Sequence, residues 1–380
     1  MSSKRYDVVV AGTGTMGSAA LYHLARRGRK VLGLDRWAAP HSHGSMHGRT
    51  RVIRLAYHEH LDYVPLLLRA YELWHDLEQR AGQQLLHEVG SIEVGAPDGW
   101  VVSGAVHACE VHGLPYELLE PAEVARRHPA LRAGPGTVGL AQPDSGFLLA
   151  EESVEAHLAQ ARAAGAELHT GERVLGWEAS GETVTVRTDA GTYESGRLVL
   201  APGAWASSLM QLPRELLRVE RQVVAWFDPV SAGDVTSERL PVFVFEEGDD
   251  VFYGFPAIDE RGVKLGLMHH PGDTVDPDVV PPAEPAETAA LRAFLERRLP
   301  DAAGPLHEAQ ACLFTMTPDG AFVLDLHPDA PNVVIASVCS GHGFKFASVV
   351  GEIAADLAES GATPHSIDFL RYARFPNWSG

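Results

Sequence analysis

Three glycines at the spacing G-x-G-x-x-G, Gly12, Gly14 and Gly17, are the first residues of this chain with chemical potential. An apolar run of strand length precedes them, and a helix-forming segment follows. In this setting the glycines allow a tight turn, close approach of backbone to a pyrophosphate, and close packing of helix on strand. Asp35 ends the second predicted strand, the position at which a carboxylate in such a unit accepts hydrogen bonds from the ribose hydroxyls of the cofactor. Together these features predict a dinucleotide-binding unit.

A histidine- and arginine-rich stretch, residues 41–54, follows this unit directly. Arginine beside a flavin stabilises the anionic reduced ring, and beside a carboxylate it forms a two-point clamp. Arg49 and Arg51 alternate before the apolar pair Val52 and Ile53, so at least one arginine is expected to point inward.

Lysine is scarce in this chain, with only four among 31 basic residues. Lys4 and Lys30 lie at predicted strand edges and are expected to be solvated. Lys264 lies in an apolar strand, and Lys345 lies in the turn Ser340–Phe346, and neither belongs to a charge run. The alternative is a side chain whose ammonium reaches water, but a functional role is favoured for both.

Two further features carry reactive or anion-binding groups. Cys312 lies in an apolar strand, where a cysteine is most often an inert small hydrophobe. The residues alone therefore leave a reactive role as the minority interpretation. The turn at 340–346 opens a helix, so its amides can bind an anion such as a flavin carbonyl or a substrate carboxylate. Three cysteines without paired spacing predict neither a disulfide framework nor a metal site.

The elements that must position these residues alternate along the chain. Helix and buried-strand patterns occur at the start, middle and end, and β-rich segments lie between them. We predict an α/β fold with a discontinuous, glutathione-reductase-like Rossmann domain (residues 1–86, 147–215 and 318–380). An inserted α+β substrate domain (87–146 and 216–317) would be built on a mostly antiparallel sheet. Glycine-bearing strand ends at Gly12, Gly203 and Gly341 would meet at one edge, which suits a long cofactor such as FAD.

The composition of the chain limits the classes of partner that it can bind. A net charge of −19 argues against nucleic acid and anionic membranes, which need a basic face. No apolar run reaches the roughly 20 residues of a membrane span, and no signal-peptide core is present. We therefore expect a cytoplasmic protein that acts on a small molecule.

Over essentially its whole length the chain resembles the monomeric sarcosine oxidase and N-methyltryptophan oxidase family of flavoproteins. The likeness is strongest in the glycine unit, Pro40–Tyr57, Tyr253–Pro256, Ala311–Cys312 and Ser340–Phe346. The last of these, with its continuation to Ile353, is highly specific and closer to the N-methyltryptophan branch.

This resemblance implies roles for individual residues. FAD would be attached through a cysteine thioether at Cys312, with Cys339 as the lower-ranked alternative. Arg54 and Lys345 would hold the substrate carboxylate, and Lys264 would assist oxygen reduction. His47 and Arg51 would lie beside the flavin ring. The remaining expected site residues are Tyr253 in the catalytic pocket and Arg36, Ser45, Val174, Gly203, Gly341 and Gly343 around the cofactor.

The chain also departs from the family pattern. Arg49 and Leu55 replace an aspartate and a histidine, and Phe314 replaces a tyrosine. The pocket histidine falls on Met268, unless His269 or His270 takes its place. These changes make the pocket less polar and favour a bulkier or more apolar substrate than sarcosine.

The combined interpretation is a monomeric FAD-dependent oxidase of an N-methyl or cyclic secondary amino acid. Hydride transfer to the flavin would give an imine, and O2 would be reduced to hydrogen peroxide. The alternative within the class is a flavin dehydrogenase that passes electrons to a carrier protein or quinone. A nicotinamide-dependent dehydrogenase and a non-catalytic FAD-binding module are the remaining alternatives.

Overall fold

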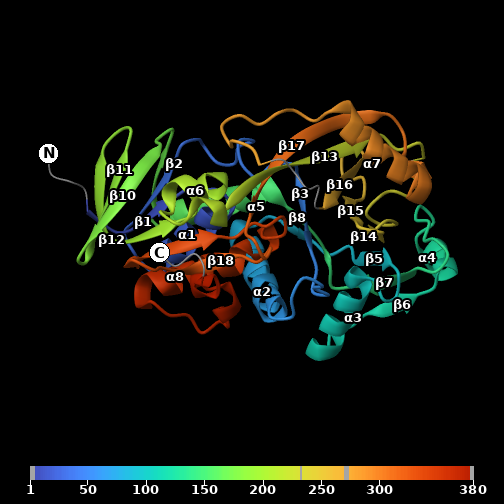
Figure 1. The fold of residues 1–380 in the computed structure, drawn as a ribbon, viewed down its shortest axis with the longest axis horizontal. Helices are drawn as coiled ribbons and strands as arrows, with labels where there is room; N and C mark the ends of the chain where they lie inside the picture. The colour runs from blue at the N-terminus through green and yellow to red at the C-terminus, as the bar shows by residue number, and fades with distance from the viewer. Residues whose placement is uncertain (1–4, 232, 269–273, 377–380) are drawn as a thin grey trace.

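The computed structural model describes residues 5–231, 233–268 and 274–376. Two large sheets dominate the chain and lie side by side, with a small sheet between them (Figure 1).

The first sheet is a Rossmann-type arrangement. Five parallel strands run in the order β9 (Glu167–Thr170), β2 (Val31–Asp35), β1 (Arg5–Ala11), β12 (Thr192–Leu200) and β19 (Ala330–Ser337), with β18 (Val323–His327) antiparallel at the edge. A hairpin of β10 (Val174–Ser180) and β11 (Thr183–Thr188) pairs antiparallel with the first part of β12.

Strand β1 shows why this sheet is covered on both faces. Val8 and Val10 pack into one hydrophobic cluster, whereas Val9 and Ala11 belong to another. Successive side chains of a strand point to opposite faces, so an almost continuous apolar run must be buried on both sides.

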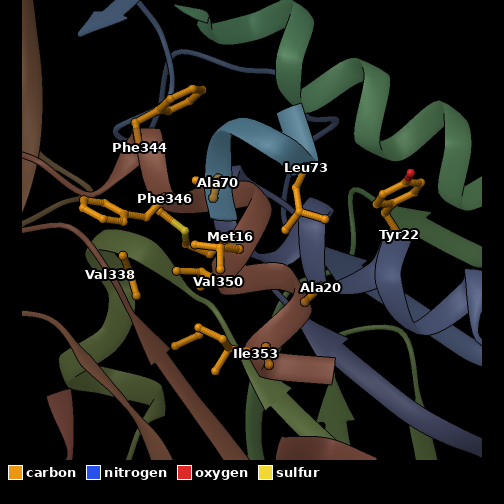
Figure 2. Packing of buried hydrophobic residues seen from close by; sticks show 14 of the residues in the cluster. Met16, Ala20, Tyr22, Ala70, Leu73, Val338, Phe344, Phe346, Val350 and Ile353 are labelled. Carbon is orange, nitrogen blue, oxygen red and sulfur yellow. The ribbon is translucent and has the colours of Figure 1, made fainter. Parts of the chain in front are cut away.

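Four helices pack together on the first of these faces: α1 (Thr15–Arg26), α2 (Tyr63–Ala81), α5 (Ala150–Ala163) and α8 (Ala347–Ser360). Figure 2 shows Ala20 of α1, Leu73 of α2 and Ile353 of α8 within this shared core. Gly351 lets α8 approach α1 closely, because a Cβ there would lie 2.6 Å from the Cβ of Ala19.

The second sheet has the order β17 (Leu306–Met316), β13 (Arg218–Phe227), β16 (Val263–Met268), β15 (Asp250–Phe255), β14 (Val242–Glu247), β5 (Ser91–Gly95), β7 (Val138–Gln142) and β6 (Glu117–Leu119). Every pairing is antiparallel except that of β14 with β5. Helix α7 (Pro285–Arg298) covers β13 and β16, and Phe294 stacks on Phe252 at 4.2 Å. Helices α3 (Trp100–His112) and α4 (Pro121–Arg127) pack near β5, β6 and β7.

A three-stranded sheet is formed by β3 (Thr50–Ile53), β8 (Gly146–Leu149) and β4 (Leu86–His87). It contains two of the positions at which the sequence predicts a change of domain, at residues 86–87 and 146–147. The short helix α6 (Ala206–Leu209) and several 3-10 turns complete the described chain.

The helix and strand patterns predicted at the start, middle and end of the chain, with β-rich segments between them, are present in the structure. The elements between residues 87 and 146, including α3 and α4, were not predicted. Among the described residues, no helix combines the length and apolar character needed to cross a membrane.

Candidate active site

A large cavity is lined by residues from both large sheets. Its walls include all but one of the predicted site residues: Gly12, Gly14, Asp35, Arg36, Ser45, His47, Arg51, Arg54, Val174, Gly203, Tyr253, Lys264, Cys312, Gly341, Gly343 and Lys345. Gly17 does not line it. A Cβ at Gly17 would lie 1.7 Å from the carbonyl oxygen of Gly12, so this glycine allows the helix to pack on the turn.

One end of the cavity is formed by the start of α1. Gly12 has a φ of +89°, and a Cβ there would lie 2.3 Å from the carbonyl oxygen of Ala201. Gly14 is the N-cap residue of α1, where no side chain caps the amides and no acidic residue occupies the first turn. A partly exposed, uncapped helix start of this kind fits the diphosphate of a dinucleotide.

Asp35 and Arg36 lie further along the same wall. The Asp35 carboxylate accepts hydrogen bonds from the backbone amides of Thr13 (2.7 Å) and Trp37 (3.0 Å), so it also fixes the glycine turn. Arg36 pairs with Asp278 at 2.5 Å and stacks on the Trp37 ring.

A turn at residues 47–50 leads into β3 and is held from two directions. The Glu151 carboxylate of α5 accepts hydrogen bonds from the amides of Gly48 (2.8 Å) and Arg49. The Lys264 amine of β16 donates to the carbonyls of Gly48 (2.6 Å) and Thr50 (2.9 Å). This turn is therefore held by helix α5, which packs on the first sheet, and by strand β16 of the second sheet.

Arg51 points inward, whereas Arg49 is directed outward. The Arg51 guanidinium donates to the carbonyls of Ser45 and His47, both at 2.6 Å. Arg49 forms an ion pair with Glu152 and is partly exposed. The expectation that at least one of these two arginines is directed inward is therefore confirmed.

Lys264 is buried, with 3% of its surface exposed. Burial lowers the pKa of its amine well below the ordinary value, and the charge on Arg51 lowers it further. Glu151 acts in the opposite direction. The amine therefore takes up a proton most readily when further negative charge develops beside it.

The two cysteines on the cavity wall differ in acidity. Burial opposes ionisation of Cys312, but the nearby His47 imidazole and the charge of Arg51 outweigh this, so the pKa of its thiol is lowered. Burial raises the pKa of the Cys339 thiol. Cys312 is thus the more nucleophilic of the two at neutral pH.

Arg54 also lines the cavity, where it is buried and already paired. Its guanidinium contacts the Glu59 carboxylate at 2.9 Å and the Glu93 carboxylate at 3.4 Å. Lys345 donates to the His342 carbonyl at 2.9 Å. Burial, with Arg54 as a second cause, lowers the pKa of Lys345 to about 7, although Glu59 raises it.

Apolar and aromatic side chains also line the cavity, namely Val224, Val244, Tyr253, Phe255, Met268 and Phe314. Met268 lines the cavity, whereas His269 and His270 lie outside the described residues. The described residues contain no group of three or more histidine, cysteine, aspartate or glutamate side chains arranged to hold a metal ion.

Sequence reasoning missed several residues that shape this site, namely Glu59, Glu93, Glu151 and Gln310. Glu93 had a usable signal, because it is a lone charged residue in the apolar strand Ser91–Gly95. The other three lie in polar surroundings that give no such contrast.

Comparison with known proteins agrees with this geometry. The family model of FAD-dependent oxidoreductases (DAO) matches residues 7–357. The chain is 40% identical over 371 residues to a monomeric sarcosine oxidase from Streptomyces avermitilis, covering 96% of each chain. It is 34% identical over 375 residues to an N-methyl-L-tryptophan oxidase from Salmonella enteritidis, covering 98% of this chain and 99% of that one.

Among solved structures, NikD, an unusual amino acid oxidase essential for nikkomycin biosynthesis, is similar with a TM-score of 0.86 at 28% identity, over 97% of this chain and 98% of that chain. An L-proline dehydrogenase from P. horikoshii shares the fold, with a TM-score of 0.84 at 20% identity over 99% of both chains. The chain belongs to the family of FAD-dependent oxidoreductases.

Proposed function

Because the chain belongs to this family, we propose that it is an FAD-dependent oxidase of an N-methyl or cyclic secondary amino acid. The observation that carries the proposal is the shared cavity. Side chains of Cys312, Lys264 and Lys345, from three distant segments, line the same space as the glycine turn at the start of α1. The sarcosine and N-methyltryptophan oxidases similar to this chain support the same class of substrate.

The cavity accounts for the cofactor and substrate in two parts. The uncapped start of α1 and the Asp35 wall would hold the diphosphate and ribose of FAD, with Arg51 and His47 beside the ring. FAD, when bound, supplies a two-electron acceptor for a hydride equivalent from the carbon next to the substrate nitrogen. Arg54 and Lys345 would bind the substrate carboxylate.

The charges around the substrate end favour a neutral amine. Whereas Glu59 and Glu93 offset the charge of Arg54, protonated Lys345 would repel a substrate ammonium and so lower the pKa of the substrate nitrogen. Its lone pair then assists loss of the hydride, and no general base is needed. The imine product hydrolyses in water, and O2 is the final electron acceptor, giving hydrogen peroxide.

The apolar wall supports a substrate larger than sarcosine. Phe314 and Met268 supply surface without hydrogen-bonding groups of the kind that a small polar substrate needs. An N-alkyl or cyclic side group would gain about 25 cal/mol for each Å² of apolar surface that it buries there.

The test of the function is an oxygen-consumption screen of purified holoenzyme over N-methyl and cyclic amino acids, with peroxide measured in parallel. We expect turnover with a secondary amino acid bearing an apolar group, and one peroxide formed for each O2 consumed. Reduction by such substrates without air reoxidation would instead support the dehydrogenase that uses a carrier protein or quinone.

Cys312 is proposed as the attachment point of the flavin, since its thiol is the more acidic of the two on the cavity wall. Acid-precipitated wild-type protein should stay yellow. Cys312→Ala should release the colour into the supernatant, whereas Cys339→Ala should not. A colourless wild-type precipitate would contradict covalent attachment while leaving FAD binding intact.

Carboxylate binding should depend on pH through Lys345. Because its pKa lies near 7 in the free protein, the amine is protonated below this pH and neutral above it. The Kd of a simple carboxylic acid without an amine should therefore rise above pH 7, by up to about tenfold per pH unit. In Lys345→Met, binding at pH 6 should weaken by roughly ten- to a hundredfold, the cost of about 1.5–3 kcal/mol for a charge-assisted contact.

Equilibrium titration of the flavin spectrum from pH 6 to 9 measures this effect. The matched control is Lys30→Met, since Lys30 is exposed, its amine donates to the Arg5 carbonyl, and it does not line the cavity. An uncharged amide analogue of the acid provides the second control. An equal loss of affinity for acid and amide would remove Lys345 from the carboxylate site.

Lys264 is proposed to assist oxygen reduction, which passes through a superoxide-like anion. A buried amine that becomes protonated as negative charge develops stabilises that anion most strongly where water is excluded. Lys264→Met should slow reoxidation by air by orders of magnitude and change anaerobic reduction by substrate much less. Stopped-flow spectroscopy of the two half-reactions measures this, with Lys30→Met as control. Slower reduction with unchanged reoxidation would make Lys264 a substrate residue.

A further inference from the structure

His58 and Glu93 form a buried pair beside Arg54. The His58 Nδ1 atom lies 3.4 Å from one oxygen of the Glu93 carboxylate, and the other oxygen lies 3.4 Å from Arg54 Nη1. Both side chains of the pair are fully buried. Within the described chain, His58 Nδ1 and both Glu93 oxygens have no hydrogen-bond partner. A carboxylate buried in this way is costly, so the pair calls for an explanation.

Arg54 identifies the protonation state of His58 in the free protein. The Arg54 Nη2 atom lies within hydrogen-bonding distance of His58 Nε2, at 3.4 Å. A guanidinium has only donors, so Nε2 must present its lone pair. The single proton of the ring is then on Nδ1, the atom that faces Glu93. A doubly protonated ring would direct an N–H bond at Arg54. His58 is therefore neutral while Arg54 keeps this position.

A substrate carboxylate at Arg54 would create an excess of negative charge. Arg54 already contacts the Glu59 and Glu93 carboxylates. Lys345 can supply one further positive charge, but burial lowers its pKa to about 7, so the amine is largely neutral at higher pH. Buried anions without a matching cation are costly. His58 lies between the two carboxylates, with Nε2 3.7 Å from Glu59, so it is placed to supply the missing charge.

We propose that His58 takes up a proton from solvent when a substrate carboxylate binds to Arg54, and that Glu93 and Glu59 hold the resulting imidazolium. Arg54 Nη2 turns from His58 to the substrate, and the lone pair on Nε2 becomes an N–H bond with a proton supplied by water or buffer. The ring then donates towards both carboxylates that already face it. His58 and Glu93 act through Arg54 and are positioning residues. Their role rests on the proposed carboxylate site.

Other titratable groups near the pair come from several elements. Trp100 of α3 packs edge-on against the His58 ring at 4.4 Å. Burial lowers the pKa of His342 to about 4, raises the pKa of Cys109 to about 12 and raises that of Tyr57 well above its ordinary value. This leaves Lys345 and His58 as the groups whose charge changes most readily between pH 6 and 9. The charged and titratable groups around the pair are Arg54, Glu59, Tyr57, Cys109, His342 and Lys345.

The first measurement counts the protons that accompany a bound acid. Cyclopentanecarboxylate, which has an apolar ring and no amine, is titrated into holoenzyme by calorimetry at pH 8 in phosphate and in Tris, two buffers with different ionisation enthalpies. The difference in heat gives the number of protons taken up. His58→Asn keeps a donor towards Glu93 but has no group that titrates, so uptake should fall by about half a proton or more. Lys345→Met should retain the share that belongs to His58.

The second measurement is the Kd of the same acid from pH 6 to 9, followed by the flavin spectrum. Proton uptake makes binding weaker as the pH rises. His58→Asn should therefore bind roughly three- to tenfold more weakly than wild type at pH 6 and nearly equally at pH 9. Glu93→Gln removes a buried anion, so it should bind roughly three- to tenfold more tightly than wild type at pH 9. Loosened packing would not produce this gain of affinity.

Matched controls are His107→Asn and Glu178→Gln, both at exposed positions, and they should alter neither measurement. Unchanged proton uptake in His58→Asn overturns the proposal, as does a stable Glu93→Gln protein that binds the acid no more tightly at pH 9. If Glu93→Gln is unstable, the result for His58→Asn decides alone. Equal binding of the acid and of cyclopentanecarboxamide by wild type would instead remove the carboxylate site of the proposed function, and this inference with it.

Discussion

The turn at residues 47–50 is the constraint on which the site depends. Its amides bind a carboxylate of α5, and its carbonyls bind a buried amine of β16. A buried lysine is costly unless its donors are satisfied, and here backbone oxygens satisfy them. Because Glu151 and Lys264 hold the turn from two sides, His47 and Arg51 reach the cavity at fixed positions although residues 47–49 belong to no helix or strand.

The part of the cavity wall around Arg54 is ordered by paired charges. Arg54 meets Glu59 and Glu93, so its burial is compensated before any ligand arrives. A substrate carboxylate must share or replace these partners. Two cations, Arg54 and Lys345, thus meet the two carboxylates only while Lys345 is protonated, and Lys345, with its lowered pKa, is the cation whose charge varies most readily. Selectivity for a carboxylate then depends on a small difference between two large energies, the cost of desolvating these charges and the attraction between them.

The sequence predicted the dinucleotide unit and most strands well because their signals are local. Glycine spacing, apolar runs of strand length and the isolated Lys264 can each be recognised within a few residues. It did not predict α3, α4 or the neighbouring strands, where helix α3 has only a weak amphipathic pattern and β6 is three residues long.

Contacts between distant segments explain the rest of what was missed. Glu151 and Gly48 are 103 residues apart along the chain, and no local pattern links them. The pairing of Arg54 with Glu93 arises only when β5 packs beside residues 54–59. The sequence identified many of the residues that line the site, whereas their hydrogen-bond and ion-pair partners could be identified only from the fold.

The site depends on which face of strand β17 each side chain occupies. Cys312 and Phe314 face the cavity, whereas the intervening Leu313 packs with Val219 and Ala204. Inserting or deleting one residue upstream of Cys312 would exchange the two faces, bringing apolar side chains to His47 and polar ones into the opposite core. Only insertions or deletions of two residues would keep the same side chains facing the cavity. The length of β17 should therefore stay constant among related chains, which makes this strand a reliable reference when their sequences are aligned.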